Sequence, residues 1–466
     1  MKKSNLGITL ITSIMLLSGC GGSGFQNNST QNKPTNDTIP EVWDMKAYLP
    51  TFDTSKEIEI TFWHTMGDSL ETVLEGIIAD FNVKYPNIKV SATSVGEYRD
   101  VRDAVIKNIP VNKTPNLAYC YPDHVAIYKN SGAVQALDEY LMDTTYGLTN
   151  GERQKFVEGF YQEGRAFGDG KNYALPFVKS TEVLYYDAKY FAENNLTVPT
   201  TWDELWAVCE QIKAKNKDCI PFGYDSESNW FITNAAQNGY TYTTADKSHG
   251  VSGHFLFNVK GNRDFVSDLK TKYDKGLFTT EEMYGAYTSG LFTATENKAY
   301  LCIGSTGGAQ YQYSSKFETG IATIPQVKGG KDAVISQGPS ICMFDKQNQQ
   351  EEIASWLFLK HLTTDIKAQS TFAQESGYIP SYLDAQTSDD YKTYLSGASG
   401  TYKKCVTALA AKVAVEQSSK YFTSPAFVGS AQARDEVGKI IINVLGGTPV
   451  ETAFDDAIQT CIEAVS

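Results

Sequence analysis

Few residues of this chain stand at spacings that support catalysis. Ser267 and Lys270 match the S-x-x-K pattern of a serine nucleophile, but they fall in an amphipathic helical pattern without S-D-N or K-T-G companions. His249 and His254 lack the spacing of metal ligands, and no C-x-x-C pair is present, so we expect no metal site. Walker, H-E-x-x-H and G-x-S-x-G motifs are missing too. We therefore expect no enzyme and no cofactor.

The charged and aromatic residues leave broader classes open. Facing carboxylates, as in a glycoside hydrolase, are one interpretation of the 54 Asp and Glu residues, and a solvated acidic surface is the other. A net charge of −13 argues against a nucleic-acid partner, because phosphate backbones require basic patches. Aromatic residues make up 12% of the chain, and flat side chains of this kind often stack on sugars or polyols.

The amino terminus predicts export and lipidation. Lys2 and Lys3 precede an apolar run at 6–17, which is short of the roughly 20 residues of a spanning helix. The run ends in Leu17-Ser18-Gly19-Cys20, which resembles a bacterial lipobox. Residues 1–19 would then be a lipoprotein signal peptide, with Cys20 lipidated on the extracytoplasmic face of the cell membrane. An ordinary secretory signal with a chance cysteine is the alternative.

The segment that follows is polar, and the rest is long enough for two or three lobes. Residues 20–56 are rich in Gly, Asn, Ser, Thr, Gln and Pro, so we expect a lipid-anchored flexible linker there.

Seven cysteines remain beyond Cys20, and an odd number leaves at least one unpaired. Cys209 and Cys219 could close a short loop, whereas buried free thiols are the other interpretation.

Alternating patterns along the chain predict an α/β fold. The first third reads as strand, helix, strand, helix, strand at 58–63, 70–81, 88–92, 101–109 and 116–121. A further strand is predicted at 183–186. Thr201 and Glu204 form a capping box before a helix at 202–215, and more helices are expected at 264–275, 351–362 and 432–445.

Several short motifs, in order, resemble the carbohydrate solute-binding proteins of ABC importers. They are Ile60 to Gly67, Asp80-Phe81-Asn82, Ala174 to Phe177, Leu184 to Asp187, Thr201 to Leu205, Gly377 to Pro380 and the ending at 446–464. This resemblance implies a type II periplasmic-binding-protein-like fold, with two lobes, a central ligand cleft and several crossovers. The N-terminal lobe is expected to comprise 57–178 and 323–362, and the C-terminal lobe 179–322 and 363–466.

Within that family the chain is most similar to the glycerol-3-phosphate-binding branch. The ligand residues that the resemblance implies are Tyr98, Ser180, Trp230, Ser305, Gly338, Tyr378 and Arg434. Where that branch has a glutamate for the glycerol hydroxyls, this chain has Asp123 one residue later. An arginine with several neutral donors suits a phosphate monoester. Other interpretations are open: a solvated Arg434, a core Trp230, a strand-end Tyr98, and turn-forming Ser180 and Ser305.

The predicted function is that of a lipid-anchored receptor. It would bind a glycerol-phosphate-type or carbohydrate solute in the cleft and deliver it to a membrane permease. The main alternative is a sugar or oligosaccharide receptor, which would use Trp63, Trp230, Tyr98 and Asp123 while Arg434 is structural. A surface glycoside hydrolase is an alternative from a different class.

Overall fold

Buried and partly exposed side chains alternate from Ile60 to the end of β1 (Ile58–His64), which lies within the first sheet. It pairs in parallel with β2 (Ile88–Ser94) on one side and with β3 (Leu117–Cys120) on the other. The helices α1 (Asp68–Lys84) and α2 (Tyr98–Asn108) connect these strands in the chain. The predicted β-α-β-α-β order is therefore confirmed.

The computed structural model describes residues 43–246, 252–296, 298–397 and 403–465. The predicted signal peptide, the lipidation site Cys20 and His249 lie outside the described residues. No helix in these ranges combines the length and apolar character needed to cross a membrane.

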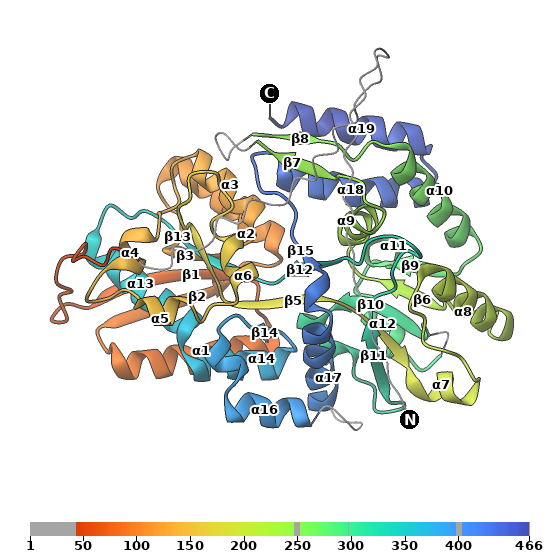
Figure 1. Ribbon diagram of the computed structural model, residues 1–466, viewed down its shortest axis with the longest axis horizontal. Coiled ribbons are helices and arrows are strands. Elements are labelled where there is room, and N and C mark those ends of the chain that lie inside the picture. The colour runs from red at the N-terminus through yellow and green to blue at the C-terminus, as the bar shows by residue number, and fades with distance from the viewer. Residues whose placement is uncertain (1–42, 247–251, 297, 398–402, 466) are drawn as a thin grey trace, which may run out of the picture. The chain divides into compact units, whose positions relative to one another are not determined.

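Two further strands complete the first sheet through antiparallel pairing, in the order β2-β1-β3-β13-β4. Figure 1 labels the first four of these strands. β13 (Ser340–Met343) pairs with β3 on one side and with β4 (Ala174–Pro176) on the other. α13 (Gln349–Thr364) packs on β1. We call this sheet and the helices packed on it the first lobe.

The second sheet has eight strands and is built around the long strand β5 (Val178–Asp187). The sheet and its associated helices form the second lobe. Its other strands are β6 (Phe222–Tyr224), β9 (Phe278–Thr280), β10 (Leu301–Ser305), β11 (Thr319–Thr323), β12 (Val334–Gln337), β14 (Ile379–Pro380) and β15 (Tyr421–Phe422). A separate two-stranded sheet consists of β7 (Thr243–Ala245) and β8 (Gly253–Phe255).

Helices cover both sheets. The capping box predicted at Thr201 and Glu204 is present at the start of α8 (Trp202–Lys215). The remaining helices are α3 (Pro122–Asn130), α4 (Asp138–Met142), α5 (Asn150–Arg153), α6 (Glu158–Glu163), α7 (Ala188–Glu193), α9 (Glu227–Gln237), α10 (Lys260–Asp274), α11 (Glu281–Tyr284), α12 (Ser289–Phe292), α14 (Ile366–Ser376), α15 (Leu383–Gln386), α16 (Asp389–Ser396), α17 (Lys403–Glu416), α18 (Ser430–Leu445) and α19 (Val450–Glu463), with short 3₁₀ segments η1 (Ile109–Val111), η2 (Thr306–Gln312) and η3 (Ser418–Lys420).

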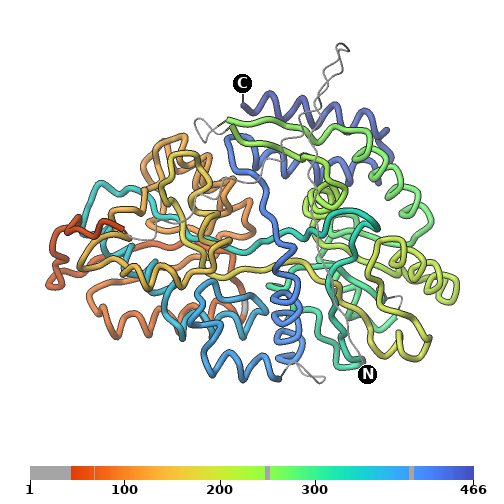
Figure 2. Tube along the Cα trace, in the orientation of Figure 1, coloured from red at the N-terminus to blue at the C-terminus, as the bar shows by residue number. Residues whose placement is uncertain are grey.

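The chain passes between the sheets three times: from β4 to β5, from β12 back to β13, and after α13 from the first sheet to β14 of the second; the first two passages are short and adjacent. Only residue 177 separates β4 of the first sheet from β5 of the second, and only 338 and 339 separate β12 from β13. The two crossings lie side by side, because Gln337 pairs with Ser180 and Ser340 pairs with Pro176. The lobe boundaries stay a proposal, and this pairing favours placing the return crossing at 338–339 rather than near residue 323. Figure 2 follows both passages along the trace.

Residues 43–56 pack against the first lobe, although the sequence predicted a flexible linker over 20–56. Trp43 and Phe52 are buried, and the Phe52 N–H donates to the Tyr146 hydroxyl at 2.8 Å. The Trp43 ring also contacts the Arg153 guanidinium at 4.6 Å. The prediction relied on the average polarity of the segment and overlooked these two buried apolar residues. Residues 43–56 are therefore not part of a flexible linker.

All seven cysteines in the described residues are free thiols, and six of them are buried. Cys209 and Cys219, for which a disulfide was one interpretation, both lie in the hydrophobic core of the second lobe. Burial raises the pKa of the Cys209 thiol, which is consistent with a small apolar core residue.

Candidate ligand-binding site

A pocket lies beside the crossings and is lined by residues of both lobes. The first lobe contributes Tyr121, Asp123 and Glu163, from β3–α3 and from α6. The second lobe contributes the end of β12, the loop before α18, and α18 itself. Three predicted ligand residues line it: Asp123, Gly338 and Arg434.

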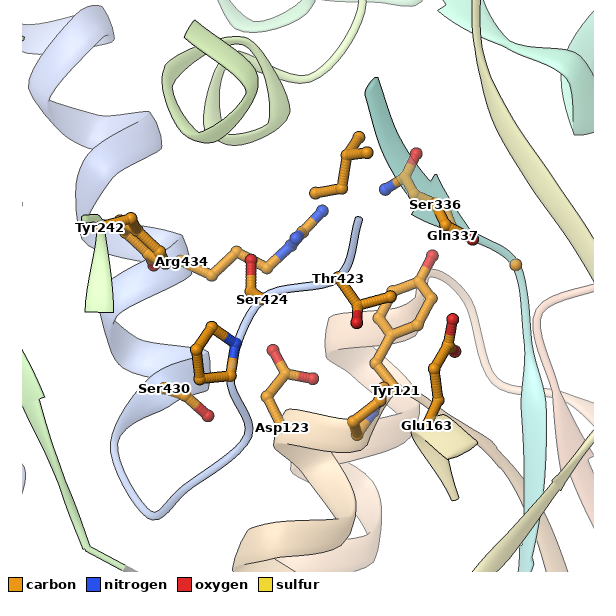
Figure 3. A pocket seen from close by; sticks show the side chains of 14 residues that line it. Tyr121, Asp123, Glu163, Tyr242, Ser336, Gln337, Thr423, Ser424, Ser430 and Arg434 are labelled. Atoms are coloured by element: carbon orange, nitrogen blue, oxygen red, sulfur yellow. The ribbon is translucent and has the colours of Figure 1, made fainter. Parts of the chain in front are cut away.

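Arg434 reaches into this pocket from α18 (Figure 3). Its guanidinium donates to Asn229 Oδ1 of α9 and lies over the Tyr121 ring, 5.8 Å from the centroid. The next residue, Asp435, is instead paired with Arg102 of α2 at 3.1 Å. Among the described residues no carboxylate oxygen lies within 4 Å of the Arg434 guanidinium. The charge of Arg434 is therefore held in place by neutral groups and remains available to an anion.

A row of tyrosines continues from Arg434. The Tyr121 ring stacks on the Tyr98 ring, with centroids 4.4 Å apart. Tyr378 adjoins Tyr98: burial raises the pKa of Tyr98, and the neighbouring Tyr378 raises it further. Tyr378 in turn packs on Gly307, where an added Cβ would lie 2.4 Å from its ring. The predicted residues Tyr98 and Tyr378 thus connect with the pocket through Tyr121.

Ser305 lies at the far end of this row. Its hydroxyl accepts from the Gly307 N–H at 3.1 Å and caps the 3₁₀ segment η2. The turn-forming interpretation of Ser305 fits these contacts, and the residue also adjoins Tyr378 through Gly307.

Gly338 and Ser180 lie at the crossing itself. Gly338 has a φ of +97°, and an added Cβ would be 2.7 Å from the Val178 carbonyl and 2.9 Å from the Ser180 N. A glycine is needed here, because any side chain would clash with the backbone of the adjacent crossing. Ser180 is 2% exposed and lies under this contact, outside the residues that line the pocket.

The structure does not bring Trp230 into this pocket. Its ring is fully buried in the core of the second lobe, stacked on Tyr224 at 4.5 Å. Consecutive helix residues point about 100° apart, so Asn229 reaches Arg434 while Trp230 points into the core. The core interpretation of Trp230 therefore fits the structure.

A buried ion pair lies between the pocket and the crossing. Lys179 Nζ is 2.5 Å from Glu163 Oε2, and the two side chains are 1% and 5% exposed. The same ammonium donates to the Gly338 carbonyl and to Ser340 Oγ, each at 3.2 Å. Burial raises the pKa of Glu163, although Lys179 opposes that effect. The pair joins α6 to both crossing strands.

Sequence reasoning missed Tyr121, Asn229, Gln337 and Glu182. Asn229 accepts from Arg434 and from Gln337 Nε2, the latter at 3.2 Å, and it donates to Glu182 Oε1 at 3.0 Å. No pattern in the sequence links Glu182, Asn229 and Gln337, which lie on β5, α9 and β12. The sequence did offer a signal for Tyr121 as a site residue, because it directly precedes Pro122 at the end of a predicted strand.

Two sheets joined by adjacent crossings, with a pocket between their lobes, define a two-lobed binding protein. A model of the bacterial extracellular solute-binding protein family matches residues 76–396, and the chain belongs to this family. Receptors of this kind serve ABC importers, so the family predicted from the sequence is confirmed, while the lipid anchor stays a prediction.

Relatives and solved structures agree with this assignment. The sn-glycerol-3-phosphate-binding periplasmic protein UgpB of Yersinia pestis is 25% identical over 333 residues, which cover 69% of this chain and 74% of that protein. UgpB of Mycobacterium tuberculosis, solved with glycerophosphocholine, has a TM-score of 0.72 at 17% identity and covers 87% of this chain and 98% of its own. MalE of Bdellovibrio bacteriovorus, bound to maltotriose, has a TM-score of 0.69 at 22% identity and covers 88% and 100%. The type II periplasmic-binding-protein fold is thereby confirmed.

Proposed function

We propose that this receptor binds a phosphate-bearing glycerol compound, such as glycerol-3-phosphate or a glycerophosphodiester, in the pocket around Arg434. The observation that carries the proposal is the Arg434 guanidinium, which faces the pocket without a carboxylate partner among the described residues. A planar guanidinium can donate two parallel hydrogen bonds to a phosphate, which gives both strength and orientation.

Other groups at the pocket suit the rest of such a ligand. Thr423, Ser424 and the Gln337 amide line it and offer neutral donors. Asp123, at the start of α3, offers acceptors for glycerol hydroxyls, and the Tyr121 ring offers a face for C–H groups. Ser180, Ser305, Gly338, Tyr378 and Tyr98 keep supporting roles at the crossing and along the tyrosine row.

The two lobes would close on this ligand and present it to a membrane permease. Contacts from both lobes give the ligand a higher affinity for the closed state, which is how binding shifts the equilibrium. We propose that the receptor performs no covalent chemistry and that Cys20 anchors it by lipid to the extracytoplasmic face of the membrane. The support for the anchor is the motif at residues 17–20.

A neutral oligosaccharide is the second candidate ligand. The row formed by Tyr121, Tyr98 and Tyr378 favours it, because sugars stack on aromatic faces. Two further aromatic residues predicted for this role point elsewhere: Trp63 packs against the core of the first lobe and Trp230 lies in that of the second. The phosphate reading is therefore preferred.

Ligand-induced thermal shifts test the choice. We expect glycerol-3-phosphate or sn-glycero-3-phosphocholine to raise the Tm, because a ligand that binds the folded state stabilises it. Arg434→Ala should raise the Kd about 100-fold or more, since two charged hydrogen bonds at about 1.5–3 kcal/mol each are lost. Arg263→Ala is the matched control, because that arginine pairs with Glu451 on the outer helices α10 and α19. A response to maltotriose alone would contradict the phosphate proposal, and turnover of a glycoside would indicate an enzyme.

A further inference from the structure

Glu182 is a carboxyl group buried behind the arginine, on the central strand β5. Its side chain is 1% exposed. Oε2 accepts from the Tyr224 hydroxyl at 2.6 Å, and Oε1 accepts from Asn229 Nδ2 at 3.0 Å. Neither donor carries a charge, and no cation lies within 4 Å of this carboxylate in the described part of the chain. Glu182 therefore differs from an ordinary member of a buried ion pair.

Asn229 connects this carboxyl to the pocket. Its amide nitrogen donates to Glu182, and its oxygen accepts from both Arg434 and Gln337. An arginine has donors only, so the oxygen of Asn229 has to face it, and the nitrogen is left for Glu182. The carboxyl accepts the amide N–H in this same orientation, so it stabilises the arrangement that holds the guanidinium in the pocket.

The charged and titratable groups that face Glu182 come from two elements. Tyr224 ends β6 and Asp225 follows it, and Arg434 lies on α18, while α9 contributes the Asn229 amide. The Gln417 amide, which follows α17, donates to the Glu182 backbone carbonyl and not to the carboxyl. Burial raises the pKa of Glu182 to about 7, while Tyr224, Asn229 and Arg434 act against this effect and Asp225 adds to it. The carboxyl therefore changes charge near neutral pH, and the positive charge of Arg434 favours its ionised form.

We propose that Glu182 is a positioning residue linked to ligand charge: it fixes the Asn229 amide that holds Arg434, and it takes up a proton when a phosphate group binds at the guanidinium. The proposal rests on the phosphate ligand proposed above. A bound anion offsets the charge of Arg434, so the Glu182 carboxylate loses its favourable neighbour and gains an unfavourable one.

The existing hydrogen bonds accommodate that proton. It would come from solvent and attach to Oε2, and the Tyr224 hydroxyl can then accept instead of donate. Oε1 continues to accept from Asn229, so the amide does not have to turn and Arg434 keeps its position. Binding and proton uptake are therefore linked without a rearrangement of the site.

Isothermal titration calorimetry measures this linkage directly. The probe is sn-glycero-3-phosphocholine, a diester whose phosphate does not titrate near neutral pH. Titrations near pH 7 in two buffers of different ionisation enthalpy should show uptake of about half a proton per ligand. The Kd should rise as the pH increases from about 6 to about 8.5, by up to about tenfold per unit.

Two variants separate this role from a structural one. Glu182→Gln keeps an acceptor for Asn229 but cannot titrate, so it should bind with no net proton uptake and with a flat pH profile. Glu352→Gln is the matched control, because Glu352 is also buried and accepts from a tyrosine hydroxyl, that of Tyr140 at 2.9 Å, in the first lobe. It should keep the uptake of the unchanged protein.

Each result decides the matter. Binding of the diester by the unchanged protein without proton uptake overturns the inference, even where Glu182→Gln fails to fold. Uptake that persists in folded Glu182→Gln also overturns it. If no phosphate compound binds, the proposed function fails, and the inference fails with it.

Discussion

Two buried glutamates, Glu182 on the crossing strand β5 and Glu163 on the adjoining helix α6, have opposite surroundings. Glu163 is paired with Lys179, whereas within the described residues the Glu182 carboxylate receives hydrogen bonds from the Tyr224 hydroxyl and the Asn229 amide. Lys179 and Glu182 both belong to β5, three residues apart, so their side chains lie on opposite faces of the strand. Glu163 contacts the crossing through Lys179, and Glu182 is connected to the pocket residue Arg434 through Asn229.

The comparison shows how surroundings decide the role of a buried carboxylate. A full counter-charge makes the Glu163–Lys179 pair a fixed structural connection between α6 and the crossings. Neutral donors leave Glu182 without a paired counter-charge, and burial raises its pKa to about 7 although Arg434 opposes that effect. Variants that remove one charge at a time should therefore act in opposite directions.

The largest effect is expected from breaking the ion pair. Lys179→Met leaves Glu163 as an unpaired buried charge, and this should lower the free energy of unfolding by about 3–5 kcal/mol. Chemical denaturation at pH 7 measures it. The double variant Lys179→Met with Glu163→Leu should recover much of the loss, because an apolar pair replaces the isolated charge.

An exposed ion pair serves as the control. Lys155 pairs with Asp384 at 2.6 Å, with 43% and 36% of the two side chains exposed. Lys155→Met should cost at most about 1 kcal/mol. Equal losses for Lys155→Met and Lys179→Met would contradict a special role of the buried pair.

A smaller effect is expected from the backbone that the ion pair holds. Gly338→Ala places a Cβ 2.7 Å from the Val178 carbonyl at a positive φ, so we expect a loss of about 2–3 kcal/mol in unfolding free energy. Gly329→Ala separates the two causes, because Gly329 has a φ of +75° but open space around it. If Gly329→Ala loses as much unfolding free energy as Gly338→Ala, the effect is due to the positive φ alone and not to the close crossing.

The sequence could predict much of the fold because periodicity and capping act locally. β1, α1, β2 and the capping box at Thr201 all follow from residues close together in the chain. The short strands β12 and β14 were not predicted, since their pairing with β5 depends on partners more than 150 residues away.

The site was harder to predict than the fold. Arg434, Asp123 and Gly338 were singled out by resemblance and do line one pocket. Asn229 and Glu182, by contrast, gain their meaning from hydrogen bonds between α9, β5 and α18, which no spacing in the chain reveals. The prediction chose Trp230, which lies in the core, and missed the preceding residue, Asn229, which contacts Arg434.

The smallest effect should come from removing the titrating charge of Glu182, and its sign should be opposite to that of the ion-pair variants. The folded-state pKa of about 7 lies above the ordinary glutamate value of 4.5, so stability should fall as the pH rises from about 4.5 through 7. Glu182→Gln should therefore be more stable than the unchanged protein by about 1–2 kcal/mol at pH 8 and nearly equal to it at pH 5. Denaturation at both pH values measures the difference. Destabilisation at pH 8 would mean that the ionised carboxylate is well solvated or paired, and the contrast between the two glutamates would be lost.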